Sequence, residues 1–316
     1  MNRLVLLLSQ EFNYDKIIVP DCGPFYSRSL GISSTQIETA DWDPSVTWIV
    51  DNRMTEKELQ IILQVISQKK QTKFLIRIVD PYWETAIATP QLRFAFKISS
   101  LHNVGFLSPY QPEEVVSFLF ETSLISKKFF VSPYPYNKDD ELEFESSWKR
   151  RKRGCALAGR PDKSIYPYRS FLRRKKWTDL RIWGKVGMLC HPGYPDLGVG
   201  LTHNKVGGSF ISWLASYESA YLCPSRCHLE FLKYRECAYA GCCPIGAMPR
   251  TMSGELSSLI VPLDWQGYQA KRDFWLGMSR AEIKKKAWAY REAMRKERDP
   301  QVLRTQLLGR LAGWRI

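Results

Sequence analysis

Two short segments carry residue types and spacings that can bind a metal ion. Cys223, Cys227 and His228 have a spacing compatible with zinc, but no second pair at ligand spacing accompanies them. Asp41 and Asp43 form a D-x-D pair of the kind that holds a divalent cation. A proline follows this aspartate pair directly and favours a loop. We therefore expect neither segment to bind a metal ion, and we expect the protein to need no metal.

A third segment, residues 232–246, concentrates side chains able to bind a polar ligand. Its pattern predicts a helix that carries Tyr234, Arg235 and Glu236, stops at Gly241 and leads into a short apolar strand. The same pattern is typical of an amphipathic helix that ends in a glycine cap before a core strand. Both interpretations stay open on this segment alone.

The elements that must position these residues form two successive α/β halves. With 316 residues, the chain is long enough for two domains. In the first half, alternating apolar strands and helices predict a parallel sheet covered by helices. The predicted strands and helices of this half are 3–8, 46–50, 56–68, 73–79, 103–107 and 112–121.

The second half repeats this alternation after the proline-rich segment 132–136. Its predicted elements are strands 154–158, 180–184, 221–224, 242–246 and 259–263, with helices 170–175, 210–220, 229–240 and 279–298. We therefore predict an α/β protein with two Rossmann-like domains facing a cleft. The predicted domains are 1–138 and 139–278, followed by 279–316 as basic helices that pack back on the first domain.

Charge divides unevenly between these halves. Residues 1–138 contain 14 basic and 14 acidic side chains, so the whole excess of +14 lies in residues 139–316. Such asymmetry indicates that the second half meets an anionic partner. A phosphate-bearing small molecule, a nucleic acid and an anionic membrane surface all qualify.

Cysteine usage and hydropathy predict a cytoplasmic location. None of the eight cysteines forms a C-x-x-C pair, and several lie in apolar stretches where free cysteine is a small buried hydrophobe. No apolar run approaches the ~20 residues that cross a bilayer. The N-terminal run, residues 4–8, ends too early for a signal peptide.

Four elements in the second half, taken in order, resemble a known enzyme family. They are Cys155-Ala-Leu-Ala-Gly-Arg-Pro with Tyr166-Pro-Tyr-Arg169, His191-Pro-Gly-Tyr194, Leu222-Cys-Pro-Ser-Arg226, and the 232–246 segment. Their order is similar to that of GT-B-fold glycosyltransferases of the CgeB-like branch. The resemblance covers roughly residues 150–250 and implies a hexosyltransferase-like enzyme that uses a nucleotide-sugar, UDP- or GDP-linked, and no cofactor.

The resemblance also implies roles for individual residues. Glu236 matches the glutamate that accepts hydrogen bonds from the ribose hydroxyls, as acids beside ribose do in dinucleotide folds. The other donor-binding candidates are Gly159, Arg160, Tyr166, Arg169, Ser225, Arg226, Tyr234 and Gly241. Glycine allows the backbone to approach a ligand, the arginines neutralise a diphosphate, and Ser225 caps a helix whose N–H groups face a phosphate.

The catalytic base is less constrained than the donor site. Retaining relatives carry a second glutamate eight residues before the ribose-binding one, but this sequence has His228 there. An inverting mechanism needs a base that deprotonates the acceptor hydroxyl. Asp51 and Asp80 end predicted strands and are the catalytic candidates, with a helix cap and a turn as their structural alternatives. His191 is a third candidate.

Two alternatives to a small-molecule or glycan acceptor follow from the charge. Aromatic and basic residues alternate over 149–183, a pattern compatible with nucleic-acid binding or with glycosylation of DNA bases. The helix 279–298 and the tail 303–316 are basic and amphipathic, which suits a peripheral membrane contact or a lipid-linked saccharide acceptor. We favour packing against a core for these helices, because apolar stripes usually face one.

Overall fold

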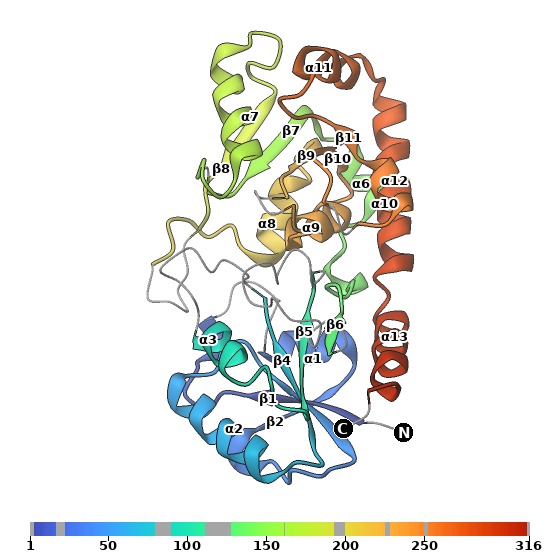
Figure 1. The fold of residues 1–316 in the computed structure, drawn as a ribbon. Coiled ribbons are helices and arrows are strands. Elements are labelled where there is room, and N and C mark those ends of the chain that lie inside the picture. Colours follow the sequence, from blue (N-terminus) through green and yellow to red (C-terminus); the bar gives the residue numbers. More distant parts are fainter. Residues whose placement is uncertain are drawn as a thin grey trace. The chain divides into compact units, whose positions relative to one another are not determined.

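A computed structural model shows that the chain forms two compact units. It describes residues 3–16, 23–79, 90–110, 128–160, 162–192, 200–224, 228–249 and 252–314. Unit 1 comprises Met1–Pro135 together with Arg298–Ile316, and unit 2 comprises Tyr136–Glu297. Each unit is built on its own sheet, in which every described strand pair is parallel (Figure 1). The predicted α/β class with two parallel sheets is confirmed.

Unit 1 has a six-stranded sheet in the order β2-β1-β3-β4-β5-β6. Its strands are β1 (Arg3–Leu8), β2 (Ser33–Gln36), β3 (Val46–Val50), β4 (Lys73–Arg77), β5 (Val104–Ser108) and β6 (Phe129–Val131). Its described helices are α1 (Gly23–Leu30), α2 (Glu56–Gln68), α3 (Pro90–Lys97) and α13 (Pro300–Ala312), with short 3-10 turns at Tyr14–Lys16 and Ile37–Thr39.

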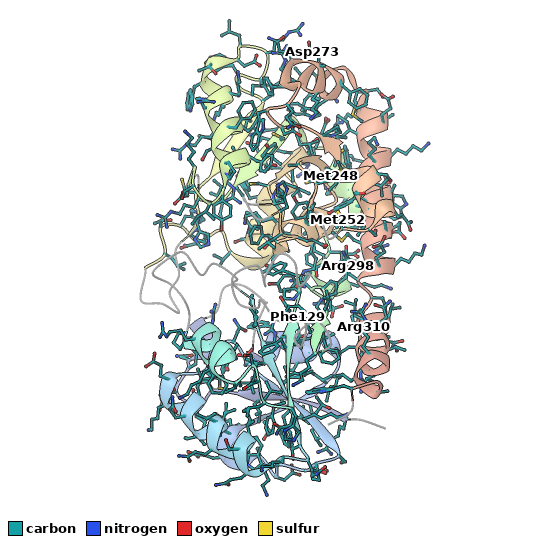
Figure 2. The ribbon with its side chains drawn as sticks, in the orientation of Figure 1. Phe129, Met248, Met252, Asp273, Arg298 and Arg310 are labelled. Carbon is teal, nitrogen blue, oxygen red and sulfur yellow. The ribbon has the colours of Figure 1, made fainter. Side chains whose placement is uncertain are left out.

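The C-terminal helix α13 completes one face of this sheet. Its apolar stripe, Leu303, Leu307 and Leu311, is buried against α1 and the strands, where Leu6 and Ile49 contribute to the same core. Arg310 extends this contact to the edge strand β6, because its guanidinium donates to Val131 O at 3.3 Å (Figure 2). Helices α2 and α3 cover the other face (Figure 1).

A buried ion pair lies at the carboxyl end of this sheet. Asp51 follows β3 and is fully buried, and its Oδ1 is 3.0 Å from Nη1 of Arg77, the last residue of β4. Asp51 also accepts hydrogen bonds from the Gly23 amide and the Tyr14 hydroxyl. The guanidinium of Arg77 lies 3.6 Å from the centre of the Tyr26 ring. These contacts tie α1, β3 and β4 together.

Unit 2 has a five-stranded sheet in the order β11-β10-β9-β7-β8. Its strands are β7 (Lys152–Ala158), β8 (Val186–Leu189), β9 (Tyr217–Leu222), β10 (Cys243–Gly246) and β11 (Val261–Pro262). Its described helices are α6 (Phe144–Trp148), α7 (Pro167–Thr178), α8 (Gly207–Leu214), α9 (Leu232–Ala240), α10 (Gly254–Leu259), α11 (Tyr268–Gly277) and α12 (Arg280–Glu297), with a 3-10 turn at Lys138–Asp140.

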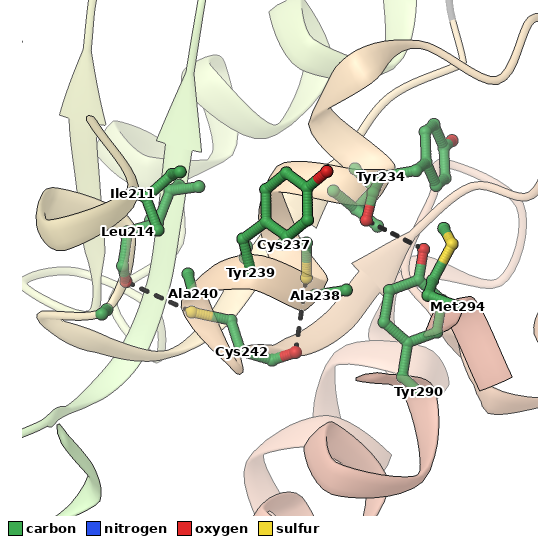
Figure 3. Close-up of a cluster of buried hydrophobic side chains, with 14 of the residues drawn as sticks. Ile211, Leu214, Tyr234, Cys237, Ala238, Tyr239, Ala240, Cys242, Tyr290 and Met294 are labelled. Carbon is green, nitrogen blue, oxygen red and sulfur yellow. Dashed lines mark hydrogen bonds between the residues drawn. The ribbon is translucent and has the colours of Figure 1, made fainter. Parts of the chain in front are cut away.

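Helix α9 is buried in one of the two cores of unit 2. Cys237 and Cys242 bracket its C-terminal end, and the Cys237 thiol donates to Cys242 O at 3.3 Å (Figure 3). The Tyr290 hydroxyl of α12 donates to Tyr234 O at 3.2 Å in the same cluster. Burial raises the pKa of both thiols, so these cysteines stay protonated and act as small apolar side chains.

Two predicted elements of unit 2 are wrong. Residues 180–184 form a turn rather than a strand, because Asp179 Oδ1 accepts the Arg181 amide at 3.0 Å and Gly184 has a φ of +76°. Strand β8 therefore starts later, at Val186. The predicted helix 210–220 ends at Leu214, and its last residues belong to β9, because a continuous apolar run does not distinguish helix from strand. The predicted helix 112–121 lies outside the described residues.

The long basic helix α12 also turns its apolar stripe inward. Ile283, Ala287, Tyr290 and Met294 are all buried in the cores of unit 2. Within the described residues, none of the helices combines the length and the apolar character needed to cross a lipid bilayer. The apolar stripes of α12 and α13 are therefore accounted for by packing within each unit.

We predict that Asp51→Ala lowers the free energy of unfolding by about 3–5 kcal/mol, because it leaves the Arg77 guanidinium buried without its carboxylate. Denaturant titration of both proteins measures the difference. Glu56→Ala is the matched control, since it breaks the exposed pair between Glu56 and Arg93 and should cost less than about 1 kcal/mol. Equal losses in the two variants would contradict a structural role for Asp51.

Candidate functional site

The topology of unit 2 identifies where a ligand is expected to bind. From β7 the chain first moves to β8 on one side and then returns to β9 on the other side of β7. In open parallel sheets, ligands bind outside the carboxyl ends of the strands at such a reversal. Gly159 and Arg160 directly follow β7, so both lie at this point.

Gly159 is required by its backbone conformation and by its neighbours. Its φ is +103°, and its amide donates to Leu189 O at 2.9 Å. A Cβ at this position would lie 2.7 Å from Arg169 Nη1 and 3.2 Å from Lys233 Cε. The glycine therefore lets two cationic side chains approach the end of β7 closely.

Arg169 is fixed beside the carboxyl end of β7 by contacts with neighbouring residues of unit 2. It lies in the first turn of α7 and is buried, its Nη1 donates to Arg160 O at 2.8 Å, and its guanidinium is 4.2 Å from the centre of the Tyr166 ring. Among the described residues, no carboxylate forms an ion pair with Arg169. A buried guanidinium in this situation favours an anionic ligand.

Lys233 adds a second cation from helix α9. Its ammonium lies 4.8 Å from the centre of the Phe210 ring and 4.0 Å from Glu236 Oε2. Burial lowers the pKa of Lys233, and the nearby Arg169 lowers it further, while Glu236 partly opposes both effects. Lys233 is absent from the sequence-based candidates. Its position three residues before Glu236, on the same helix face, was the available signal.

Glu236 presents a carboxylate oxygen with unused hydrogen-bonding capacity. Within the described part of the chain, its buried Oε2 accepts no hydrogen bond, and the Lys233 ammonium at 4.0 Å is too distant for one. Buried carboxylate oxygens normally accept hydrogen bonds. Glu236 can therefore accept hydrogen bonds from a ligand that lies beside Lys233 and Arg169.

His191 completes what we call the switch-point cluster: Gly159, Arg169, His191, Lys233 and Glu236. The pKa of His191 is lowered to about 4, first by burial and then by positive charge on Lys233, Arg169 and other neighbours. The imidazole is therefore neutral at pH 7. His191 therefore lies in surroundings that are partly buried and positively charged.

Other sequence-based candidates have different surroundings. Tyr166 lies under the Arg169 guanidinium, whereas Tyr234 is fully buried and its hydroxyl donates to Ala247 O at 2.8 Å. Gly241 caps the far end of α9 in a left-handed conformation, just before β10 begins beside the start of β9. Tyr234 and Gly241 therefore support the core. Gly241 lies at the amino-terminal ends of the strands, whereas Gly159 lies at their carboxyl ends.

The remaining candidates fall into two groups. Asp80, Ser225 and Arg226 lie outside the described residues. Asp51 is described, but its oxygens are occupied by the Arg77 ion pair and by two further donors. That arrangement stabilises a fold and leaves no exposed basic oxygen for a proton transfer.

The candidate metal ligands have local roles. Asp43 Oδ1 accepts the Ser45 amide at 2.8 Å and Asp41 Oδ1 accepts the Asp43 amide at 3.3 Å, as in a polar turn. Cys223 is described, whereas Cys227 is not. No group of three or more His, Cys, Asp or Glu side chains in the described residues is placed to hold a metal ion.

Comparison with known proteins shows the fold. No family model matches the chain, and no curated protein matches its sequence. Among solved structures, an alpha-glucosyltransferase in complex with UDP and a 13-mer DNA is similar, with a TM-score of 0.60 and 9% identity over 99% of this chain and 100% of that one.

Two further solved structures cover both chains almost completely. HepE from Anabaena, in complex with UDP and glucose, has a TM-score of 0.56 and 7% identity over 99% of this chain and 100% of its own. A UDP-forming alpha,alpha-trehalose-phosphate synthase from Burkholderia vietnamiensis has a TM-score of 0.51 and 12% identity over 99% of each. The chain shares the GT-B type of fold with these glycosyltransferases.

We predict that Gly159→Ala costs more stability than Gly184→Ala. Both glycines have positive φ, but a Cβ at Gly184 meets nothing within 4 Å, whereas at Gly159 it displaces Arg169. The excess loss should be about 1–3 kcal/mol, measured by thermal or denaturant unfolding. In an Arg169→Ala background most of the excess should disappear, because only the looser contact with Lys233 Cε at 3.2 Å is left. An excess that is undiminished without Arg169 would contradict this packing.

We also predict that His191 titrates near pH 4 in the folded protein. Unfolded His191 binds its proton near pH 6.5, so the unfolded state holds more protons between these values. This group therefore lowers the free energy of unfolding as pH falls from about 6.5 to 4, by up to about 1.4 kcal/mol per pH unit.

Proton NMR of the four histidines tests this prediction directly. The resonance that His191→Gln removes identifies His191, and the other three serve as internal references. The Lys233→Met substitution should raise the pKa of His191, because it removes a nearby positive charge. A midpoint near 6.5 for His191 in the unmodified protein would contradict its burial beside these cations.

Proposed function

We propose that this protein is a glycosyltransferase that moves a sugar from a nucleotide-sugar donor to an acceptor hydroxyl. The observation that carries the proposal is the switch-point cluster, in which a buried arginine and a lysine lie beside a carboxylate with an unused oxygen. The fold supports it, since the similar solved structures include glycosyltransferases in complex with UDP.

In this proposal the cations of the cluster bind the donor diphosphate. Lys233 and Arg169 lie against the backbone of Gly159, where a phosphate can approach closely. A nucleoside diphosphate gains negative charge as the glycosidic bond breaks, and fixed cations stabilise that charge in the transition state. Arg160 and Arg226 are further candidates for this role.

Glu236 is proposed to bind the ribose of the same nucleotide. Its carboxylate lies one helical turn beyond Lys233, and an ionised carboxylate accepts hydrogen bonds from both vicinal hydroxyls. UDP and GDP are the proposed nucleotides, without an additional cofactor. Membership of the CgeB-like branch is part of the proposal and rests on the order of four sequence elements.

We place the acceptor in the first unit, across a cleft of the GT-B type. Asp51 is not suited to be the base, because it is fully buried in an ion pair. His191 has a pKa near 4 and is a weak proton acceptor at neutral pH. Asp80 is therefore the candidate base that we retain.

DNA is the second candidate acceptor. One similar structure is an alpha-glucosyltransferase in complex with DNA, and the excess positive charge of this chain lies wholly in residues 139–316. Phosphate contacts of that kind make affinity fall steeply with salt. A glycan, a small molecule or a lipid-linked saccharide would show no comparable dependence.

Calorimetric titration with UDP, GDP and their nucleosides tests the donor site. We predict that Glu236→Gln weakens both the preferred nucleotide and its nucleoside, because both carry the ribose. Lys233→Met should weaken only the nucleotide, because only the nucleotide carries phosphate. Loss of one charge-assisted hydrogen bond costs about 1.5–3 kcal/mol, or at least roughly tenfold in affinity.

Glu292→Gln is the matched control, since Glu292 lies on α12 and is exposed, and it should bind as tightly as the unmodified protein. Absence of binding to any of these compounds, with salt-sensitive DNA binding instead, would overturn the donor proposal. Equal loss of nucleoside and nucleotide in Lys233→Met would contradict a diphosphate role for this residue.

A further inference from the structure

The last turn of α7 and the turn that follows it expose three large apolar side chains at the surface of unit 2. The exposed fractions are 64% for Trp177, 88% for Leu180 and 64% for Trp183. Phe274, 58% exposed, lies on the neighbouring helix α11. Single exposed apolar residues are ordinary, but several exposed at one helix end and the turn after it indicate a binding surface.

This turn is held in place by ion pairs and hydrogen bonds. Asp179 Oδ2 accepts from the Tyr268 hydroxyl at 2.9 Å and from Arg272 Nη1 at 2.7 Å. Arg181 Nη1 lies 2.6 Å from Oδ1 of Asp273, which Figure 2 labels on α11. Ile182 is fully buried between the exposed residues. The apolar side chains are therefore presented by an ordered turn.

The charge around the turn is positive. Both of its acidic neighbours, Asp179 and Asp273, are paired with arginines. Arg173 and Arg174 are exposed on α7, and no carboxylate in the described residues lies within ion-pair distance of either. We call Arg173, Arg174, Trp177, Leu180 and Trp183 the α7 surface.

We propose that the α7 surface docks the protein on an anionic lipid bilayer. Tryptophan favours the interface between headgroups and acyl chains, and an apolar side chain such as Leu180 gains by entering it. Arginines beside such residues are attracted to anionic headgroups. Stacked nucleic-acid bases would use the tryptophans and arginines but would give Leu180 no comparable gain.

The proposal assigns membrane contact to a different region from the basic C-terminal helices. The apolar stripes of α12 and α13 are buried within their units, whereas the apolar side chains of the α7 surface are exposed to solvent. Arg173 and Arg174 lie in the middle of α7, whereas the apolar residues of the α7 surface lie at the C-terminal end of this helix and beyond it. Arg169 lies in the first turn of that helix, about 13 Å from Thr178 along the helix axis.

Vesicle flotation of the full chain tests this proposal. One vesicle type is pure phosphatidylcholine, and the other mixes two parts of phosphatidylcholine with one part of phosphatidylglycerol. We expect binding to the mixed vesicles that Leu180→Ser weakens about tenfold, since a leucine side chain loses its apolar transfer. Arg173→Gln with Arg174→Gln should weaken it about thirtyfold.

Val302→Ser is the matched control, because Val302 is exposed on α13 and its change should leave vesicle binding unchanged. Nucleotide titration of the same variants should equal that of the unmodified protein, which separates this proposal from the donor site. Three outcomes would overturn it: no binding to mixed vesicles, binding that Leu180→Ser leaves intact, or a dimer or a single-stranded DNA complex that depends on Leu180 without vesicle binding.

Discussion

The site in unit 2 depends on positive charge that the protein itself leaves unbalanced. Arg169 is buried, Lys233 is partly buried, and both lie against the end of β7. Glu236 has a carboxylate oxygen 4.0 Å from the Lys233 ammonium. Burying cations without close counter-charges costs free energy. The pKa of Lys233 and the pKa of His191 are both lowered, first by burial and then by the positive charge of Arg169. A bound diphosphate would supply the missing negative charge.

Each of the two sheets has a buried arginine at the carboxyl ends of its strands, but the two arginines have different partners. At the carboxyl end of the first sheet, the buried Arg77 meets the buried Asp51 at 3.0 Å, so the charge is balanced within the fold. At the corresponding end of the second sheet, Arg169 donates to a backbone carbonyl instead. The first arrangement stabilises a unit, whereas in the proposed function the second keeps Arg169 available for an anion. This contrast is why we assign a structural role to the Asp51–Arg77 pair and propose a functional one for the switch-point cluster.

Much of this organisation could be predicted from the sequence, and the failures have physical causes. Alternating apolar segments predicted both parallel sheets, and the ends of α9 and α12 were placed within a few residues. The tryptophan and leucine of residues 180–184 have strand-like hydropathy and so predict a strand, but the Asp179 carboxylate organises a turn there.

Site residues were harder to predict than elements, because sequence position does not give the direction of a side chain. Tyr234 and Glu236 are two residues apart on one helix, yet Tyr234 points into the core and Glu236 lies beside Lys233. Asp51 ends a strand as catalytic residues do, but its partner Arg77 is distant in sequence. Gly241 belongs to the 232–246 segment that resembles the donor-binding motif. It lies at the amino-terminal ends of the strands, however, because the chain must return there before the parallel strand β10 begins.

The most direct test of the account is a crystal structure of the protein with bound UDP or GDP. The account predicts the diphosphate within hydrogen-bonding distance of Lys233 and Arg169, close to the Gly159 backbone, and both ribose hydroxyls on Glu236. A nucleotide bound elsewhere, or a diphosphate away from the switch-point cluster with Glu236 Oε2 still without a donor, would contradict it.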